Sequence, residues 1–205
     1  MRSFRNSLIR RLPTLAGALA LGIGVASTAL TGEPRPSAGP VPYFPLAVGN
    51  YWTYRCSVDG EHQFTKTVRL VSASARDNVQ YFRAELRIKK DKPLVYYLFT
   101  DVEGHVFSVP NPSRDGSEPL ITAAPKAGEH VGTWTVAGGE RIDTPALKQV
   151  DAVRIENFDR DDPQITAERR MEWRGRYYAR DVGLLVEADG LGGECVLTQY
   201  HVRTR

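Results

Sequence analysis

Apolar and polar residues alternate with a period of two along most of the chain. Such alternation gives one apolar and one polar face, which is typical of a β-strand at the surface of a sheet. The clearest stretch covers residues 81–89, where Phe82, Ala84, Leu86 and Ile88 alternate with Arg83, Glu85, Arg87 and Lys89. Similar patterns predict strands over residues 51–58, 64–71, 94–100, 105–109, 133–136, 150–158, 165–178, 184–188 and 195–202.

Turn-forming pairs separate these predicted strands. Examples are Asp77-Asn78, Glu103-Gly104, Gly138-Gly139 and Asp189-Gly190, whose residue types suit tight hairpin connections. No segment shows a convincing helical period. The sequence therefore predicts an all-β fold, an antiparallel meander of about ten strands that forms a curved sheet or open barrel. A β-sandwich is the alternative architecture.

The N-terminus has the order of charge and hydropathy that marks a secretory signal. Four arginines precede an uncharged stretch over residues 12–32, and small residues at Ser27 and Ala29 suit cleavage after Ala29. Residues 1–29 are therefore predicted to be a signal peptide that exports the protein to the periplasm or the cell exterior. An uncleaved membrane anchor is the alternative, because the uncharged stretch is close to the roughly 20 residues that span a bilayer.

The predicted signal is followed by a change in composition. Residues 30–42 contain Pro34, Pro36, Pro40 and Pro42, which predicts a flexible proline-rich linker. Residues 43–205 are then predicted to form a single β domain, a length that suits one hydrophobic core.

Charge argues against a nucleic-acid partner. The whole chain carries a net charge of +3, from 27 basic and 24 acidic residues. Four of the basic residues and none of the acidic ones precede Ala29, so the exported chain is almost neutral. The positive net charge of the whole chain therefore comes from the predicted signal peptide. Membrane contact is expected only through this segment, if it stays uncleaved.

The two cysteines predict a disulfide bridge. Cys56 lies in the first predicted strand and Cys195 in the last, and a barrel or strongly curved sheet brings its first and last strands together. An exported protein meets an oxidising environment, so a Cys56–Cys195 bridge is expected. A redox or nucleophilic thiol is the alternative, but the chain has no third cysteine to resolve such chemistry.

Two aromatic motifs carry a resemblance to known proteins. Residues 43–54 read YFPLAVGNYWTY and residues 177–185 read YYARDVGLL. They resemble a group of uncharacterised bacterial secreted proteins with an opening (F/Y)PLxxGxxWxY and a closing YxxxVGLV, although Asp181 stands where the usual closing motif has Gly. Those proteins are similar in fold to the half-barrels of the lipoprotein-carrier superfamily, which shield acyl chains under a curved sheet. The resemblance implies a curved sheet and transfers no site residues.

No catalytic signature is present. The chain lacks a Gly-x-Ser-x-Gly elbow, a His-Glu-x-x-His pattern, a phosphate loop and a dinucleotide fingerprint. Its histidines, His62, His105, His130 and His201, have no metal-ligand spacing. We therefore expect no enzyme activity, no cofactor and no metal.

Apolar residues of the predicted strands suggest where a ligand binds. Phe82, Leu86, Tyr96, Leu98 and Trp134 are predicted to line a hydrophobic pocket under the curved sheet. The alternative is that these side chains simply fill a small barrel.

A second candidate surface lies in residues 169–180, where arginines interleave with aromatic residues. Trp173 and Tyr177 are candidates to bind an anionic glycan or lipid headgroup together with the arginines. A long outer strand whose charged face pairs with its neighbours is the alternative. The leading hypothesis is an exported, non-catalytic binding or carrier module of the cell envelope, with a lipid or other apolar ligand. The alternative is a structural or protein-interaction module that binds an envelope protein.

Overall fold

The computed structural model describes residues 43–58, 62–113, 116–159 and 163–203. All of them belong to the unit that spans Pro34–Arg205. The predicted signal peptide (residues 1–29) and linker (residues 30–42) lie outside the described residues. Within the described ranges, no helix has the length and hydropathy needed to span a bilayer.

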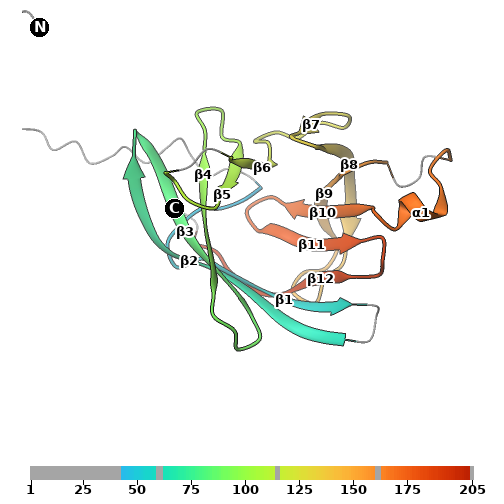
Figure 1. Cartoon of the computed structure of the whole chain (residues 1–205), viewed down its shortest axis with the longest axis horizontal. Coiled ribbons are helices and arrows are strands. Elements are labelled where there is room, and N and C mark those ends of the chain that lie inside the picture. Colours follow the sequence, from blue (N-terminus) through green and yellow to red (C-terminus); the bar gives the residue numbers. More distant parts are fainter. Residues whose placement is uncertain (1–42, 59–61, 114–115, 160–162, 204–205) are drawn as a thin grey trace, which may run out of the picture. The chain divides into compact units, whose positions relative to one another are not determined.

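Twelve antiparallel strands form one sheet (Figure 1). They are β1 (Tyr51–Val58), β2 (His62–Arg76), β3 (Val79–Ile88), β4 (Leu94–Thr100), β5 (Val106–Val109), β6 (Glu118–Ile121), β7 (His130–Val131), β8 (Trp134–Ile142), β9 (Val150–Glu156), β10 (Arg174–Ala179), β11 (Gly183–Asp189) and β12 (Glu194–His201). Each strand pairs with the next one along the chain, except that β6 does not pair with β7. β1 pairs with β12 in the middle of the sheet, so β6 and β7 are the two edge strands. The predicted all-β meander is confirmed.

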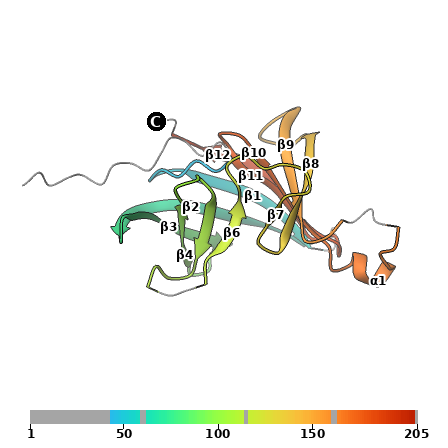
Figure 2. The same ribbon diagram turned by 90° about the horizontal axis from the view of Figure 1, so that it is seen from above.

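The sheet curves into a nearly closed barrel (Figure 2). The two edge strands, β6 and β7, approach each other but are not hydrogen-bonded to each other. A Cβ atom added to Gly132, next to β7, would lie 2.7 Å from the ring of Pro119 in β6. Pro119 has no backbone N–H to offer to a neighbouring strand. The first and last strands are instead joined in the middle of the sheet, as the cysteine positions predicted.

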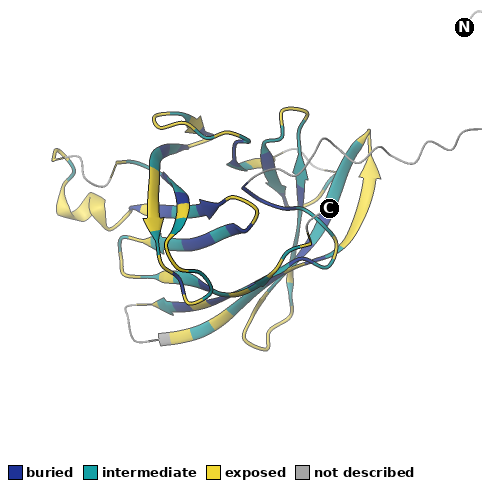
Figure 3. Ribbon diagram, turned by 180° about the vertical axis from the view of Figure 1, so that it is seen from behind, coloured by how far each residue is buried: buried dark blue, intermediate teal, exposed yellow. Residues whose placement is uncertain are grey.

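Alternation along β1 defines the inner face of the barrel, which we call the concave face. Trp52, Tyr54 and Cys56 point to this face and are 0%, 2% and 0% exposed, as expected of alternate residues in a strand with one buried face. Cys56 lies opposite Cys195 in the β1–β12 register, and the two form the expected disulfide. Figure 3 shows buried residues along the strands, whereas many turns, α1, the end of β2 and part of β8 are exposed.

The opening and closing motifs meet in space. Nε1 of Trp52 donates a hydrogen bond to the carbonyl oxygen of Val182. Gly183 follows with a φ of +106°, and a Cβ atom there would lie 3.1 Å from Nε1 of Trp52. Glycine is therefore needed both for the turn into β11 and for the close approach of the indole.

Asn50 ties the two ends of the domain together. Its Nδ2 donates to the carbonyl oxygen of Pro45 over 2.9 Å, and its Oδ1 accepts from the backbone N–H of Arg203 over 2.9 Å. Asn50 is fully buried. Water cannot reach its side-chain amide, and these two hydrogen bonds satisfy the amide nitrogen and the amide oxygen instead.

The predicted strand over residues 165–178 is wrong in its first half. Residues Ala167–Arg170 form the short helix α1, and β10 begins only at Arg174. Thr166 caps the helix by accepting a hydrogen bond from the backbone N–H of Arg169, and Glu168 lies in the first turn, where a carboxylate is favoured. This local capping prevails over the alternating pattern.

Two short strands were missed, and β2 and β8 extend beyond their predicted ranges. β6 and β7 have only four and two residues, too few to show a period. The pair Gly138-Gly139, predicted as a turn, lies inside β8 at a register shift between Val136 and Gly138. Ala137 has no partner in β9, so a β-bulge directly precedes the two glycines and lets β8 bend. The turn predicted at Asp77-Asn78 is confirmed, with positive φ values of 50° and 64°.

Candidate functional site

The seven predicted ligand-binding residues lie on two opposite faces of the sheet. Phe82, Leu98 and Trp134 are buried, and Leu86 and Tyr96 are half-buried; all five belong to the concave face. Trp173 and Tyr177 lie on the other face, where they line a groove. The structure therefore offers two separate sites.

A stripe of apolar side chains runs along the concave face towards the turn between β3 and β4. We call it the apolar stripe: Phe64, Leu86, Ile88, Leu94 and Tyr96. Register places Phe64 opposite Cys56, and Leu86 opposite Leu94, and directly opposite side chains share a face. The stripe thus crosses three neighbouring strands.

Exposure increases along the apolar stripe. Phe64, Leu86 and Tyr96 are partly buried and pack against the core. Ile88 and Leu94, nearer the turn, are 37% and 64% exposed. Apolar surface that water contacts at one end thus continues into the buried core at the other, an arrangement suited to an apolar chain that lies along the sheet.

Two cations and a carboxylate form an ion-pair cluster beside the stripe. Nζ of Lys66 lies 2.7 Å from Oε2 of Glu187, and Nε of Arg176 lies 3.1 Å from Oε1 of the same carboxylate. The side chains of Lys66, Glu187 and Arg176 are 14%, 35% and 19% exposed, respectively. Register explains the meeting, because Glu187 lies opposite both Cys195 and Arg176.

Aromatic rings surround the ion-pair cluster. The guanidinium of Arg176 lies 4.3 Å from the centre of the Trp134 ring, and Nζ of Lys66 lies 5.6 Å from the centre of the Tyr54 ring. Such cation–π contacts stabilise partly desolvated cations. A second carboxylate, Glu118 of β6, lies 3.8 Å from Nη1 of Arg176. This longer ion pair connects β10 to the edge strand of the sheet.

Electrostatics keep the cluster ionised. Burial alone would raise the pKa of Glu187, but the charges and hydrogen bonds of Lys66 and Arg176 outweigh it and lower that pKa below its usual range. Burial raises the pKa of Tyr178 to about 12, although the guanidinium of Arg176 opposes that rise. Burial likewise raises the pKa of Tyr96. The tyrosines near the cluster are therefore neutral, and Glu187 is charged, at neutral pH.

Glu187→Gln is expected to lower the free energy of unfolding at pH 7, and this loss should shrink in acid. The folded-state pKa of Glu187 lies below its unfolded value, so its stabilising effect is present above about pH 4.5 and disappears as pH falls through the folded value. Urea unfolding of both proteins at pH 7 and pH 3 measures the difference. Glu194→Gln, an exposed neighbour in β12, is the control. An equal loss at both pH values would contradict the assignment.

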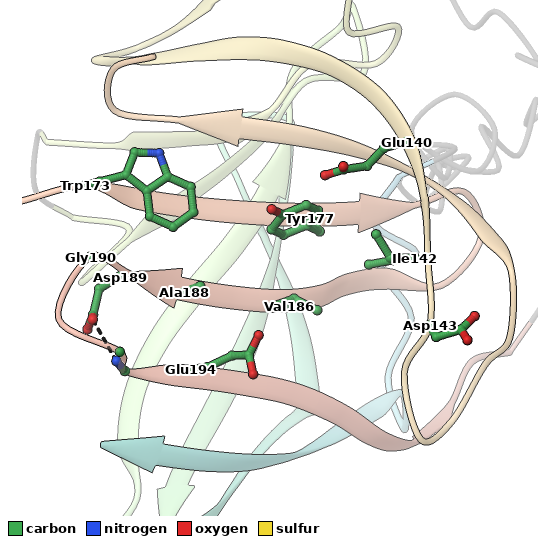
Figure 4. Close-up of a pocket in the computed structure, with 12 residues that line it drawn as sticks. Glu140, Ile142, Asp143, Trp173, Tyr177, Val186, Ala188, Asp189, Gly190 and Glu194 are labelled. Atoms are coloured by element: carbon green, nitrogen blue, oxygen red, sulfur yellow. Dashed lines mark hydrogen bonds between the residues drawn. The ribbon is translucent and has the colours of Figure 1, made fainter. Parts of the chain in front are cut away.

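The second site is an open groove of about 550 Å³ on the opposite face (Figure 4). Side chains of β10 and β11 form its floor, and the glycine-rich turn between β11 and β12 (residues 190–193) closes one end. The lining includes Trp173, Tyr177, Val186 and Ala188, and the carboxylates of Glu140, Asp143, Asp189 and Glu194. The groove is therefore acidic around an apolar floor.

Local contacts account for several of these groove residues. Trp173 is 2% exposed, its Nε1 donates to Oε2 of Glu156 over 3.0 Å, and its ring covers Gly175. Asp189 accepts hydrogen bonds from the backbone N–H groups of Leu191 and Gly193. Trp173 is thus a structural indole here, with little surface on which a ligand could stack. Arg176 points to the concave face, where it contacts the Trp134 ring, so it does not share a surface with Trp173 and Tyr177.

A cluster of potential metal ligands lies in the turn between β4 and β5. The ligand atoms of Asp101, Glu103 and His105 lie within 4.8 Å of one another. Asp101 accepts a hydrogen bond from the backbone N–H of His105 over 2.8 Å, and its other oxygen lies 3.1 Å from Nδ1 of the same residue. These contacts are those of a carboxylate that closes a hairpin turn.

Sequence reasoning missed Lys66 and Glu187. Lys66 interrupts a row of apolar residues, Phe64, Val68 and Leu70, that share its parity in β2. A charge at an apolar position of a strand was the available signal. Its partner on β11 follows only from the register of the folded sheet.

Comparison with known proteins shows the fold alone. No family model and no curated protein matches the chain. A Bacteroides fragilis protein described as exported, with a YmcC-like fold, has a solved structure that matches with a TM-score of 0.54 at 12% identity, covering 78% of this chain and 99% of the other. A protein from Parabacteroides distasonis described as a lipoprotein matches with a TM-score of 0.45 at 11% identity, with coverage of 78% and 99%.

Proposed function

We propose that this protein is an exported, non-catalytic module of the cell envelope that binds an apolar or amphipathic ligand along its concave face. The observation that carries the proposal is the apolar stripe. It joins water-exposed apolar side chains, Ile88 and Leu94, to partly buried ones that pack on the core. A ligand chain lying along it would remove this apolar surface from water.

The ion-pair cluster suggests how such a ligand would be oriented. Lys66 and Arg176 share one carboxylate, that of Glu187, and the second carboxylate nearby, Glu118, is 58% exposed at its side chain. Two mostly buried cations thus share one carboxylate that is 35% exposed. A ligand with a polar or anionic head would interact with these two cations while its apolar part follows the stripe.

Export and a non-catalytic role have separate support. The arginine-rich, apolar N-terminus has the order of a secretory signal, and the fold is shared with a solved protein described as exported. Two buried polar residues have structural partners: Asn50 bonds to Pro45 and Arg203, and Glu156 accepts a hydrogen bond from Trp173. The fold serves binding through its concave face.

Titration with a fluorescently labelled long-chain fatty acid tests the proposal. The exported chain should bind the probe saturably, and Tyr96→Ser should weaken binding by about tenfold, since it removes a large apolar contact from the stripe. Tyr97→Ser is the matched control, because Tyr97 is the next residue of β4, is also half-buried and points to the opposite face.

Native mass spectrometry of the chain purified from a bacterial envelope complements the titration. A retained lipid or other apolar molecule would support the proposal. Absence of saturable probe binding, or equal losses in the two tyrosine variants, would contradict it and favour a protein-interaction module.

A further inference from the structure

The turn between β3 and β4 combines exposed apolar and basic side chains. We call residues 88–94 the basic tip. Ile88 and Leu94, at its two ends, are 37% and 64% exposed. Between them stand three exposed lysines, Lys89, Lys90 and Lys92, with Asp91 as the one acidic residue of the tip. The turn projects at the lower edge of the view in Figure 1, and it is coloured as exposed in Figure 3.

The opposite end of β4 has the reverse charge. The turn that follows β4 carries Val102, which is 90% exposed, between Asp101 and Glu103. Exposed Leu191, in the turn before β12, likewise has the carboxylates of Asp189 and Glu194 nearby in sequence. An exposed aliphatic side chain is thus accompanied by lysines at the basic tip and by carboxylates at these other two turns. The two turns that flank β4 therefore carry opposite charges, basic before the strand and acidic after it.

We propose that the basic tip docks the protein on the surface of an anionic lipid bilayer. Lysines near such a surface are attracted by the negative potential of its headgroups. Aliphatic side chains that flank them can insert at the boundary between headgroups and acyl chains. A basic tip with exposed Ile88 and Leu94 offers both kinds of interaction, and charge complementarity favours a bilayer that carries anionic headgroups over a neutral one.

The tip is built to hold this arrangement. The backbone N–H of Lys89 donates to the carbonyl oxygen of Thr65 over 3.1 Å, and that of Asp91 donates to the carbonyl oxygen of Ile88 over 3.2 Å. Nζ of Lys89 lies 5.8 Å from the centre of the Phe64 ring. The tip is therefore anchored to β2, and Lys89 lies beside Phe64 of the apolar stripe.

Docking in this manner goes beyond the proposed ligand binding and does not depend on it. Ile88 and Leu94 belong both to the tip and to the apolar stripe, so a bilayer that contacts the tip would also contact the outer end of the stripe. An apolar ligand could then pass between the bilayer and the concave face without crossing water. The surface and the site are nevertheless separable by mutation, because Tyr96 lies outside the tip.

Sedimentation with lipid vesicles tests the proposal on the exported chain. We expect binding to vesicles of phosphatidylcholine mixed with phosphatidylglycerol, little binding to phosphatidylcholine alone, and loss of binding at high salt. Reversing two charges in Lys90→Glu/Lys92→Glu should weaken binding by about tenfold or more. The matched control, Lys126→Glu/Lys148→Glu, changes the same charge at two exposed lysines elsewhere and should behave like the parent.

The apolar contribution has its own matched pair. Leu94→Ser should weaken vesicle binding several-fold, whereas Val102→Ser, at the more exposed aliphatic residue of the acidic turn, should leave it unchanged. No binding to the anionic vesicles, or equal losses in the tip and control variants, would overturn the proposal. Binding to an acidic protein but to no vesicle would also overturn it. Fatty-acid binding by Tyr96→Ser and vesicle binding by the tip variants are scored separately, so either proposal can fail alone.

Discussion

Trp52→Ala is expected to lower the free energy of unfolding by about 3–5 kcal/mol, the range for emptying a buried tryptophan site. Trp52 is fully buried, and the centre of its ring lies 5.1 Å from that of Phe44. The substitution also leaves the carbonyl oxygen of Val182 without the hydrogen bond that the indole donates. Loss of volume and loss of a buried partner therefore act in the same direction.

Urea unfolding monitored by circular dichroism measures this loss. Tyr51→Ala is the control, because Tyr51 is the preceding residue of β1, is only half-buried and points to the opposite face. It should cost much less than Trp52→Ala. A loss below about 1 kcal/mol in Trp52→Ala would mean that the pocket around the indole collapses without penalty, contrary to its position between Phe44 and Gly183.

The strands that the sequence predicts best are those with an alternating pattern or a run of residues that favour strands. β1 is found over the predicted residues 51–58 and β4 over 94–100. In β1 one face is buried and the other is more exposed, so the residue types alternate with a period of two, whereas β4 is a short run of apolar and aromatic residues that favour strands. The turn at Asp77-Asn78 was predictable for a related reason, because these residues tolerate the positive φ that a tight hairpin needs.

The parts that the sequence mispredicts are too short, or too locally constrained, for an alternating pattern to identify them. β7 has only two residues, and β6 contains a proline at an edge where no further strand pairs. Residues 165–178 alternate in sequence, but hydrogen bonds at Thr166 begin a helical turn instead. In short segments a single capping or turn residue can outweigh a pattern that is read over many residues.

The candidate site could be predicted only in part. Leu86 and Tyr96 were identified because they lie on the apolar face of their strands, and the structure places both on the apolar stripe. Lys66 and Glu187 are 121 residues apart, and their meeting depends on the β1–β12 pairing and on register. The sequence indicates that pairing through the cysteines alone, so the ion-pair cluster had no signal beyond a charge at an apolar position.

Removing the disulfide by Cys56→Ala/Cys195→Ala is expected to destabilise the protein by about 2–5 kcal/mol. The bridge spans a sequence separation of 139 residues, for which the chain-entropy estimate is about 5 kcal/mol and forms the upper limit, because residual structure in the unfolded chain reduces it. Cys56 is fully buried, so the two alanines also lose packed sulfur atoms.

The position of the bridge in the sheet adds a reason beyond loop entropy. Strands β1–β6 and β7–β12 form two runs of neighbours, and the β1–β12 pairing is the hydrogen-bonded junction between them. The bridge joins residues directly opposite each other at this junction, next to Glu187 and the ion-pair cluster. Urea unfolding with and without dithiothreitol measures the effect: reduction should lower the midpoint of the parent towards that of the alanine variant, which also lacks the packed sulfur atoms, and should leave the variant unchanged. If reduction left the parent at its original midpoint, the junction would be held by backbone pairing and ion pairs, and the two runs of strands would need no covalent link.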